Sequence, residues 1–124
     1  MKRPTKITEL DLPIVGMKYR VSVSTRRMIV THVEEETVEC LLVREPENAH
    51  DENAVKVIID TPPYAGFHIG YIAKEVAAVL APMLDDPDYT VAVCIITEMD
   101  AVDATAMLHV ALKTPTRAKK KKSK

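Results

Sequence analysis

Charged and amide side chains crowd one short stretch of the chain, LVREPENAHDENAVKV, from Leu42 to Val57. The stretch begins and ends like a β-strand, but the residues between can ionise or form hydrogen bonds. They are Arg44, Glu45, Glu47, Asn48, His50, Asp51, Glu52 and Asn53. A hairpin needs only about two to five residues to reverse its direction. A connection of this length and polarity indicates a binding loop rather than a simple turn.

The elements that position this loop are predicted from the spacing of apolar residues. Residues 1–13 are predicted to be a polar N-terminal arm, and the domain is predicted to cover residues 14–113. Strands are predicted over VGMKYRVSV (15–23), RMIVTHV (27–33), TVECLLV (37–43), AVKVIID (54–60) and FHIGYI (67–72). The segments 27–33 and 37–43 are expected to form a hairpin.

The apolar period then changes to that of a helix. In AKEVAAVLAPML, Val76, Val79, Leu80 and Met83 fall on one helical face, which we expect to be core. The helix is predicted over about residues 73–81, because Pro82 cannot donate the helical hydrogen bond. It either ends there or restarts as a single turn that begins at Pro82.

Two more apolar segments complete the predicted fold, YTVAVCIIT (89–97) and AMLHVALK (106–113). Short strands with one helix between them favour a mainly β fold. We predict a small OB-like β-barrel of six or seven strands with one main α-helix.

The formal net charge of −1 hides a strong asymmetry between the ends of the chain and its middle. Nine of the 17 Lys and Arg lie in residues 1–6 and 117–124, whereas all 18 Asp and Glu lie between them, so residues 7–116 carry a net charge of −10. Residues 114–124 form a basic tail with almost no apolar residue, which we expect to be disordered. Because nucleic-acid binders usually have a basic body, a nucleic-acid function has to account for this acidic middle.

The sequence also predicts where the protein works. No apolar run approaches the ~18 residues of a membrane span, and MKRPTKITELDLP lacks the apolar region of a signal peptide. Cys40 and Cys94 have apolar neighbours and are predicted to be buried thiols rather than a disulfide. We expect no membrane partner, and a cytoplasmic location, associated with the nucleoid in a bacterium or phage, or a nuclear one in a eukaryote.

The central motif resembles a known family. LVREPENAHDENAVKV, followed by IGYIAKEVAAVLAPMLDD, is similar to the HIRAN domain, and the resemblance covers roughly residues 14–97. The shared pattern is R-E-P-x-N, an aromatic residue or His before Asp, x-N-A-V, a strand, and then G-Y/H-I/L-x-K-E-x-A. The resemblance implies an OB-like barrel that recognises the free 3′-OH end of single-stranded DNA in DNA repair or stalled-fork processing. It also implies a helicase or nuclease as a candidate partner protein.

The resemblance further implies a set of DNA-binding residues. Asp51 takes the place of the end-binding aspartate, His50 that of the aromatic residue before it, and Tyr19 that of a base-stacking tyrosine on the first strand. The set comprises Lys18, Tyr19, Arg20, Asn48, His50, Asp51, Tyr71 and Lys74, with Tyr71 and Lys74 as the phosphate-contacting pair. His50 and Arg20 depart from the family pattern. Histidine can still stack on a base, but it is smaller than tyrosine and can carry charge at low pH.

The chemistry of Asp51 fits such a ligand. A carboxylate repels phosphate: at an effective dielectric constant of about 20, two unit charges about 4 Å apart interact by about 4 kcal/mol. It is useful where the ligand offers a hydroxyl, because that hydrogen bond is charge-assisted. Asn48 can add a donor and an acceptor beside it, and Lys18, Arg20 and Lys74 can pair with the preceding phosphates. The basic ends can supply non-specific attraction to DNA.

Most of these residues also have a purely structural interpretation. Arg44 and Glu45 could form an ion pair at the strand end, Asn53 and Asp51 could serve only the turn, Tyr71 could lie in the core, and Lys74 could lie on a solvated helix face. The alternative function is then a protein-interaction adaptor with the same fold and no DNA binding.

Metal binding and catalysis have little support in the sequence. His50, Asp51 and Glu52 are adjacent, so their side chains diverge rather than converge on an ion. The family is also associated with zinc ion binding and acid-anhydride hydrolysis, which we attribute to the ATPases that carry the domain, because this chain has no P-loop. We expect no enzyme activity, no cofactor, no metal ligand and no catalytic residue.

Overall fold

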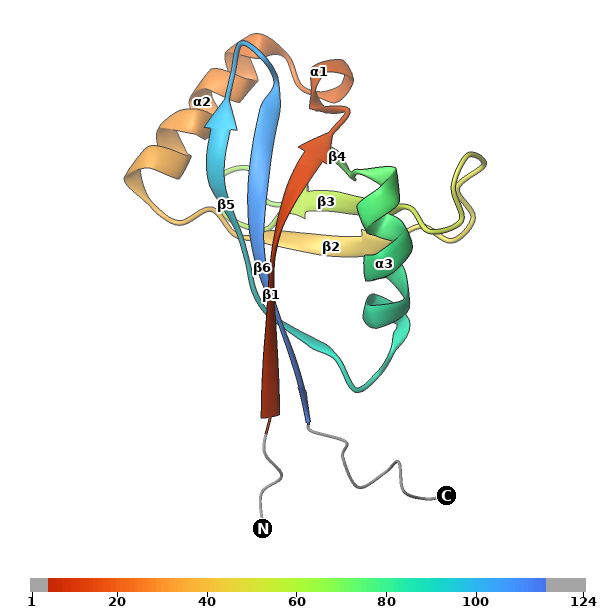
Figure 1. Ribbon diagram of the computed structural model, residues 1–124. Helices are drawn as coiled ribbons and strands as arrows, with labels where there is room; N and C mark the ends of the chain where they lie inside the picture. Colours follow the sequence, from red (N-terminus) through yellow and green to blue (C-terminus); the bar gives the residue numbers. More distant parts are fainter. Residues whose placement is uncertain (1–4, 116–124) are drawn as a thin grey trace, which may run out of the picture.

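The structure is a computed structural model that describes residues 5–115. Its elements follow one another as β1 (Thr5–Val15), α1 (Met17–Arg20), α2 (Val23–Glu35), β2 (Cys40–Arg44), β3 (Val55–Ile59), β4 (His68–Ile72), α3 (Lys74–Asp85), β5 (Thr90–Asp100) and β6 (Thr105–Pro115). Figure 1 shows β1, β6 and β5 running together as a long ribbon, with β2 and β3 crossing it.

The six strands form one antiparallel sheet in the order β2-β3-β4-β1-β6-β5. The two edge strands of this order are β2 and β5. They meet where Glu39, the residue before β2, forms a bridge with Ile95 of β5. Beside this bridge, the Ile96 N–H donates a 3.0 Å hydrogen bond to the Val38 carbonyl. The sheet therefore curls into a nearly closed barrel. This architecture confirms the prediction of a mainly β, OB-like fold.

Alternating side chains fill the barrel. In β3, Val55, Val57 and Ile59 are fully buried, whereas Lys56 and Ile58 between them are partly exposed. The buried residues of β1, β4 and β6 that meet them are Leu12, Ile14, Ile69, Ile72, Leu108, Val110 and Leu112. The strand predicted over residues 54–60 is thus confirmed as β3, and its alternation turns one side chain in two into the core immediately after the polar loop.

The strands β4 and β1 make an unusually close contact at Gly70. A Cβ atom added there would lie 2.6 Å from the Val15 carbonyl oxygen and 2.7 Å from Ile14 Cγ2. These strands pair only through Ile14 with Ile72 and Val15 with Tyr71 before the chain turns at Gly16, whose φ is +81°. The turn lays α1 against β4, so the contact at Gly70 positions α1.

The N-terminal third differs most from the sequence prediction. The predicted polar arm is wrong for residues 5–13, which belong to β1 and pair with β6 from Thr5 opposite Pro115 to Ile14 opposite Ala106. Its alternation was hidden because the outward side of β1 carries Glu9 and Asp11, so that the segment looks polar as a whole.

Two predicted strands are also wrong, those over residues 15–23 and 27–33, because α1 and α2 occupy this part of the chain. The predicted hairpin between 27–33 and 37–43 is therefore wrong as well. The Ser22 hydroxyl accepts a 3.2 Å hydrogen bond from the Thr25 N–H and caps α2. Arg26 is buried and donates to the Val21 and Ala101 carbonyls, which ties α2 to the turn between β5 and β6. These contacts outweigh the strand preference of the β-branched residues.

The predicted main helix is confirmed as α3, but it runs to Asp85 with Pro82 inside it. Its buried face is Ala77, Leu80 and Ala81, whereas Val79 is 62% exposed, so the assignment of Val79 to the core is wrong. Among residues 5–115 it is one of three helices, and the prediction of one main helix did not include α1 and α2.

The last two predicted strands are confirmed and are longer than expected. Thr114 and Pro115, assigned to the disordered tail, belong to β6, and the rest of that tail lies outside the described residues. Cys40 and Cys94 are buried free thiols, as predicted, and burial raises the pKa of Cys94 to about 12. None of the described helices is long and apolar enough to cross a membrane.

Gly70→Ala should destabilise the fold because the new methyl group cannot fit beside the Val15 carbonyl. We expect the free energy of unfolding to fall by about 1–3 kcal/mol, the range for overpacking, as measured by urea denaturation followed by circular dichroism. Val102→Ala, at a residue that is 72% exposed, is the control and should change it by less than about 0.5 kcal/mol. An unchanged Gly70→Ala protein would show that β1 and β4 can separate freely.

Candidate functional site

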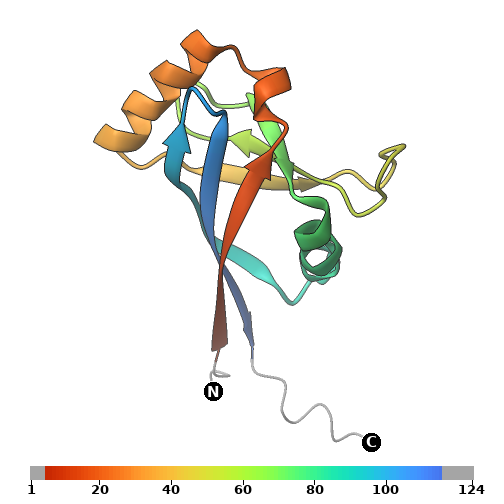
Figure 2. The same cartoon turned by 45° about the horizontal axis from the view of Figure 1, so that its top comes forward.

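Five of the eight predicted site residues line one cavity of about 330 Å³: Asn48, His50, Asp51, Tyr71 and Lys74. Val15, Ala54 and Ile72 complete its wall. Figures 1 and 2 show three of the segments that build it, the loop between β2 and β3, the end of β4 and the start of α3, on the same side of the molecule. The end of β1 adds Val15. Residues far apart in the sequence therefore share one site.

Asn48 shapes the loop from within. Its Oδ1 accepts hydrogen bonds from the backbone N–H groups of His50, at 2.8 Å, and Asp51, at 3.0 Å. Its Nδ2 donates to Glu45 Oε1 at 2.8 Å. The amide oxygen is thus committed to holding the two residues that follow, and Asn48 contributes to the cavity mainly by fixing their position.

Asp51 has the structural role in the turn that the sequence left open. Its Oδ1 accepts a 2.9 Å hydrogen bond from the Asn53 N–H, and its carbonyl accepts one from the Ala54 N–H at 3.0 Å. Of the two residues considered for the turn, Asp51 supplies the side-chain acceptor and Asn53 the backbone donor. No described residue donates to Asp51 Oδ2, and the side chain is only partly buried in the cavity wall. The carboxylate can accept a hydrogen bond from a ligand there.

Glu45 joins the loop to the sheet, a role that the sequence analysis missed. Its Oε1 accepts from Asn48 Nδ2 and from the Tyr71 hydroxyl, each at 2.8 Å, and its Oε2 lies 3.5 Å from Lys56 Nζ. The hydrogen bond from Asn48, then that from Tyr71, and the nearby Lys56 hold the pKa of Glu45 below its usual value. Because the Tyr71 hydroxyl is engaged with Glu45, Tyr71 offers a ligand mainly its ring.

Arg44 has the structural role considered in the sequence analysis, but with a different partner. It forms a two-pronged ion pair with Asp85 at the end of α3, Nε to Oδ1 at 3.0 Å and Nη2 to Oδ2 at 3.3 Å. Its Nη1 also donates to the Ala54 carbonyl at 3.0 Å. The guanidinium thus clamps both stems of the loop to α3.

The other three predicted residues lie on α1, beside the cavity rather than in its wall. The Arg20 guanidinium lies 5.6 Å from the centre of the Tyr71 ring, a cation–π contact that links α1 to the cavity. Tyr19 is 86% exposed and Lys18 is also exposed. The prediction that Tyr19 lies on the first strand is wrong, since it belongs to a helical turn, but its ring is open to solvent.

His68 supports the same cluster from β4. Its ring meets that of Tyr71 edge-on, with 4.9 Å between the centres, and its Nε2 lies 2.9 Å from the Gly70 carbonyl. Burial, followed by the nearby Arg20, lowers the pKa of His68. The cations that act on His68 here are Arg20 and Lys56, and both favour its uncharged form.

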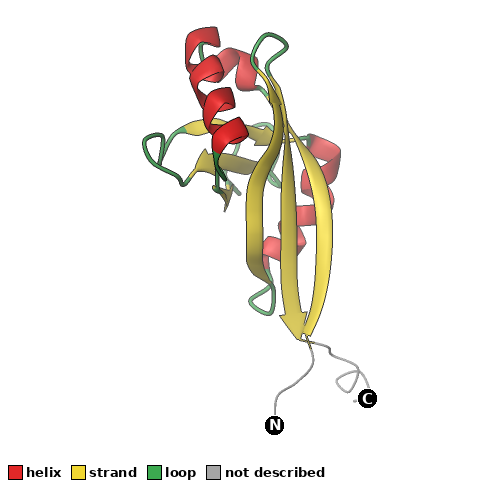
Figure 3. Ribbon diagram, turned by 90° about the vertical axis from the view of Figure 1, so that its left-hand side faces the viewer, coloured by secondary structure: helices red, strands yellow, loops and turns green. Residues whose placement is uncertain are grey.

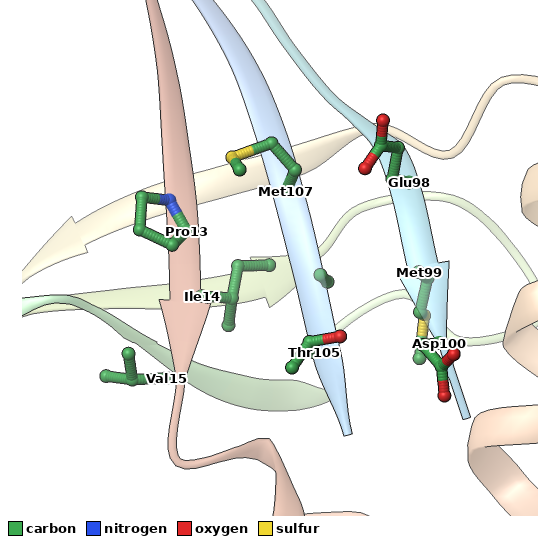
Figure 4. Close-up of a pocket in the computed structure, with 9 residues that line it drawn as sticks. Pro13, Ile14, Val15, Glu98, Met99, Asp100, Thr105 and Met107 are labelled. Atoms are coloured by element: carbon green, nitrogen blue, oxygen red, sulfur yellow. The ribbon is translucent and has the colours of Figure 1, made fainter. Parts of the chain in front are cut away.

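A second cavity, of about 490 Å³, lies on the outer face of the ribbon and shares Val15 with the first. Figure 4 shows Pro13 and Met107 in its floor, and Glu98 and Asp100 projecting from β5. Its lining includes these two carboxylates and no basic residue. It therefore disfavours an anionic ligand, and we place the candidate site in the first cavity.

Metal binding finds no support in the structure. Among residues 5–115, no three His, Cys, Asp or Glu side chains lie so that they could hold a metal ion. His50 and Asp51 reach the same cavity but gain no third acidic, histidine or cysteine partner in it.

The HIRAN domain family matches residues 7–114 of the chain. The chain belongs to the HIRAN domain family. The match extends beyond the range suggested by the motif, roughly residues 14–97, and includes nearly all of β1 and β6. The long outer ribbon is therefore part of the HIRAN domain.

Solved HIRAN structures share this fold. The crystal structure of the HIRAN domain of human HLTF matches with a TM-score of 0.68 and 24% sequence identity, over 94% of this chain and 85% of that one. The NMR structure of the HLTF HIRAN domain in its DNA-bound conformation gives 0.61 at 21% identity, over 94% and 84% of the two chains. A Lactobacillus plantarum protein gives 0.61 at 24% identity, over 90% and 99%. At these identities the likeness concerns the fold.

Two plant proteins are similar in sequence over part of the chain. A Fanconi-associated nuclease 1 homolog of rice, Oryza sativa subsp. japonica, is 34% identical over 80 residues, 61% of this chain. A putative SWI/SNF-related matrix-associated actin-dependent regulator of chromatin subfamily A member 3-like 1 of Arabidopsis thaliana is 39% identical over 72 residues, 58% of this chain. In each case the matched part is 7% of the relative, so the chain corresponds to a small part of each.

Glu45→Ala should loosen the loop because it leaves the Tyr71 hydroxyl and the Asn48 amide without their acceptor. We expect a loss of about 1–2 kcal/mol of stability, since the site is partly exposed, and faster hydrogen exchange of the His50 and Asp51 amides. Glu47→Ala, in the exposed part of the same loop, is the matched control and should change neither quantity.

The same pair of proteins tests the pH dependence of Glu45. Because its pKa is lowered from 4.5 in the folded protein, its contribution to stability is present above pH 4.5 and is lost as the pH falls through the lowered value. Urea denaturation of the wild type should show this acid loss in full, whereas Glu45→Ala should show less of it. Equal acid sensitivity in both proteins would mean that Glu45 does not stabilise the fold through its charge.

Proposed function

We propose that this HIRAN domain recognises the free 3′-OH end of single-stranded DNA as a non-catalytic binding module. The observation that carries the proposal is that the Asp51 carboxylate and the Lys74 side chain line the same cavity. A strand end offers a hydroxyl for the first group and a phosphate for the second. An internal segment of DNA has no terminal hydroxyl for Asp51.

The arrangement of charges explains how such a site distinguishes strand ends. Asp51 Oδ2 accepts a hydrogen bond from the terminal hydroxyl, and a terminal phosphate in its place brings two negative charges together, at a cost of about 4 kcal/mol at 4 Å and a dielectric constant of about 20. Lys74 pairs with the preceding phosphate, and Lys18 and Arg20 of α1 lie beside the cavity for further ones. His50 and the exposed ring of Tyr19 stack on the last bases.

The relatives agree with a function on DNA. One solved HIRAN domain of the same fold, that of HLTF, is described in a DNA-bound conformation, and one sequence relative is a Fanconi-associated nuclease homolog. We therefore propose that this domain acts in DNA repair or in the processing of stalled forks, with a helicase or nuclease as its protein partner. It then acts where DNA is, in the nucleoid or the nucleus.

Asp51→Asn should remove the preference for a 3′-OH end over a 3′-phosphate end, while the protein still binds single-stranded DNA. The Asn Oδ1 can still accept from the Asn53 N–H, so the turn is preserved, while the charge is lost. We expect binding of a short 3′-OH strand to weaken by about 1.5–3 kcal/mol, the range for a hydrogen bond to a charged group. Binding of the matching 3′-phosphate strand should stay level or rise. Fluorescence anisotropy with both strands measures the two affinities.

Asp51→Ala separates the two roles of this residue. It removes the turn acceptor as well, so it should lower the thermal stability, whereas Asp51→Asn should not. An equal loss on both strands with Asp51→Asn would disprove end recognition by this carboxylate. If the folded wild type binds neither strand, the adaptor function, with a protein ligand, is the correct one.

Tyr19→Ala should weaken binding of the 3′-OH strand by about 1–3 kcal/mol through lost base stacking, with little change in the salt dependence of binding. Tyr19 is 86% exposed, so the fold should keep its stability. Tyr19→Phe keeps the aromatic face and should bind like the wild type. Unchanged affinity of Tyr19→Ala would show that the terminal base does not stack on α1.

A further inference from the structure

Two buried cysteines face each other across the seam of the barrel, the place where β2 and β5 meet. The bridge between Glu39 and Ile95 sets the register of this seam. In an antiparallel register the next residue of one strand lies opposite the preceding residue of the other, so Cys40 lies opposite Cys94. Both side chains belong to the core, with 5% and 6% of their surface exposed. The two thiols therefore lie on the same, inner face of the sheet.

The spacing of such a pair is close to that of a disulfide. Residues directly opposite in an antiparallel ladder have Cα atoms about 4.5–5.5 Å apart, and disulfides span about 4.4–6.8 Å. Their Cβ atoms lie about 4.5–5.5 Å apart, whereas a disulfide needs about 3.5–4.5 Å, so the strands have to approach by about 1 Å. Glu39 and Ile95 form an isolated bridge rather than a ladder. Little of the sheet therefore has to move with the two cysteines.

A cavity of about 320 Å³ gives small molecules access to both thiols. Its lining comes from the start of β2, from β5 and from Asp60 after β3, and it includes Cys40 and Cys94. Figure 3, seen from the left-hand side of Figure 1, shows the long strands upright and the shorter strands lying across them. The charged residues that line the cavity are Glu39 and Asp60, and no described basic residue does so. The cavity therefore favours an uncharged molecule over an anion.

The same surroundings keep both thiols protonated. Burial raises the pKa of Cys94 to about 12. Burial, and then the charges of Cys94 and Asp60, raise the pKa of Cys40. The influence of Cys94 on Cys40 agrees with the register that sets them opposite each other. Because the thiolate is the reactive form of cysteine, the pair reacts slowly, and Cys94, which has fewer negative neighbours, ionises first.

We propose that Cys40 and Cys94 form a reversible disulfide across the seam by exchange with a small, uncharged disulfide. The Cys94 thiolate attacks one sulfur of that molecule, forms a mixed disulfide and releases the first thiolate. The Cys40 thiolate then attacks Cys94 Sγ and releases the second. The protein loses two electrons and two protons, and the small disulfide gains them as two thiols. Because the strands have to approach each other, the bond is strained and easily reduced again.

The disulfide closes a covalent ring around the segments that build the candidate site. The loop between β2 and β3, strand β4 and helix α3 all lie between Cys40 and Cys94 in the sequence. These segments carry Asp51, Tyr71 and Lys74. Oxidation therefore restrains the unfolded chain over this whole region and makes the barrel more resistant to heat and denaturant. The bond forms whatever ligand the cavity of Asp51 takes.

Oxidation of the full chain in its folded state tests the proposal. Reduced protein is incubated with hydroxyethyl disulfide at mildly alkaline pH, and the product is analysed by intact mass and by peptide mapping. The mass should fall by about 2 Da, the two thiol hydrogens, and a peptide that links Cys40 to Cys94 should appear. The melting temperature should rise by about 5–10 °C, and a dithiol reductant should reverse both changes.

The matched control moves one thiol by a single position. The double substitution Val93→Cys and Cys94→Ala keeps two cysteines and almost the same length of chain between them. Val93 is 39% exposed, and successive side chains of a strand point to opposite faces, so this variant should form the internal bridge at least about tenfold more slowly than the wild type. It should instead accumulate mixed disulfides at the exposed position.

Two results would overturn the proposal. One is a folded wild type that gains only mixed disulfides or does not react. The other is a control variant that forms its internal bridge as fast as the wild type, because equal rates mean that the bridge forms only after the barrel has unfolded.

Discussion

The close approach of β4 to β1 at Gly70 is the constraint on which the arrangement of this domain depends. Only a residue without a side chain lets the two backbones come this close, with the Val15 carbonyl and Ile14 in the space that a Cβ atom would need. The contact joins the half of the sheet that carries the polar loop to the half that forms the long ribbon. It also sets α1 against β4, and so brings Arg20 over the ring of Tyr71.

Two carboxylates of the site differ in how they are used. Glu45 is engaged in structural hydrogen bonds, whereas Asp51 keeps one carboxylate oxygen without a donor among the described residues. Glu45 accepts hydrogen bonds from Asn48 and Tyr71, and Asn48 in turn holds the backbone of His50 and Asp51. This chain of contacts fixes a loop that has no regular secondary structure of its own. In the proposed function, rigid support of this kind lets a single hydrogen bond accepted by Asp51 contribute to selectivity, because the loop need not be ordered when the ligand binds.

The sequence allowed the second half of the fold to be predicted, because β3, β5 and β6 alternate or run as apolar segments and α3 has a helical period. It misled at the N-terminus, where Glu9 and Asp11 made β1 look like an arm. It misled again at residues 27–33, where the apolar β-branched residues indicated a strand and the cap at Ser22 was not considered. The resemblance selected five residues that share one cavity. It could not reveal Glu45, because the hydrogen bond to that residue comes from Tyr71, 26 residues away.

The pairing of Thr5 with Pro115 also bears on how the domain fits into larger proteins. Entry and exit points that are adjacent in space allow a domain to be inserted into a host chain with little disturbance to either. Here the junction lies at the far end of the ribbon, about 33 Å along β1 from Val15. A protein that carries this domain as an insertion would be joined to it at this end of the ribbon, opposite the end at which Val15 lines the cavity.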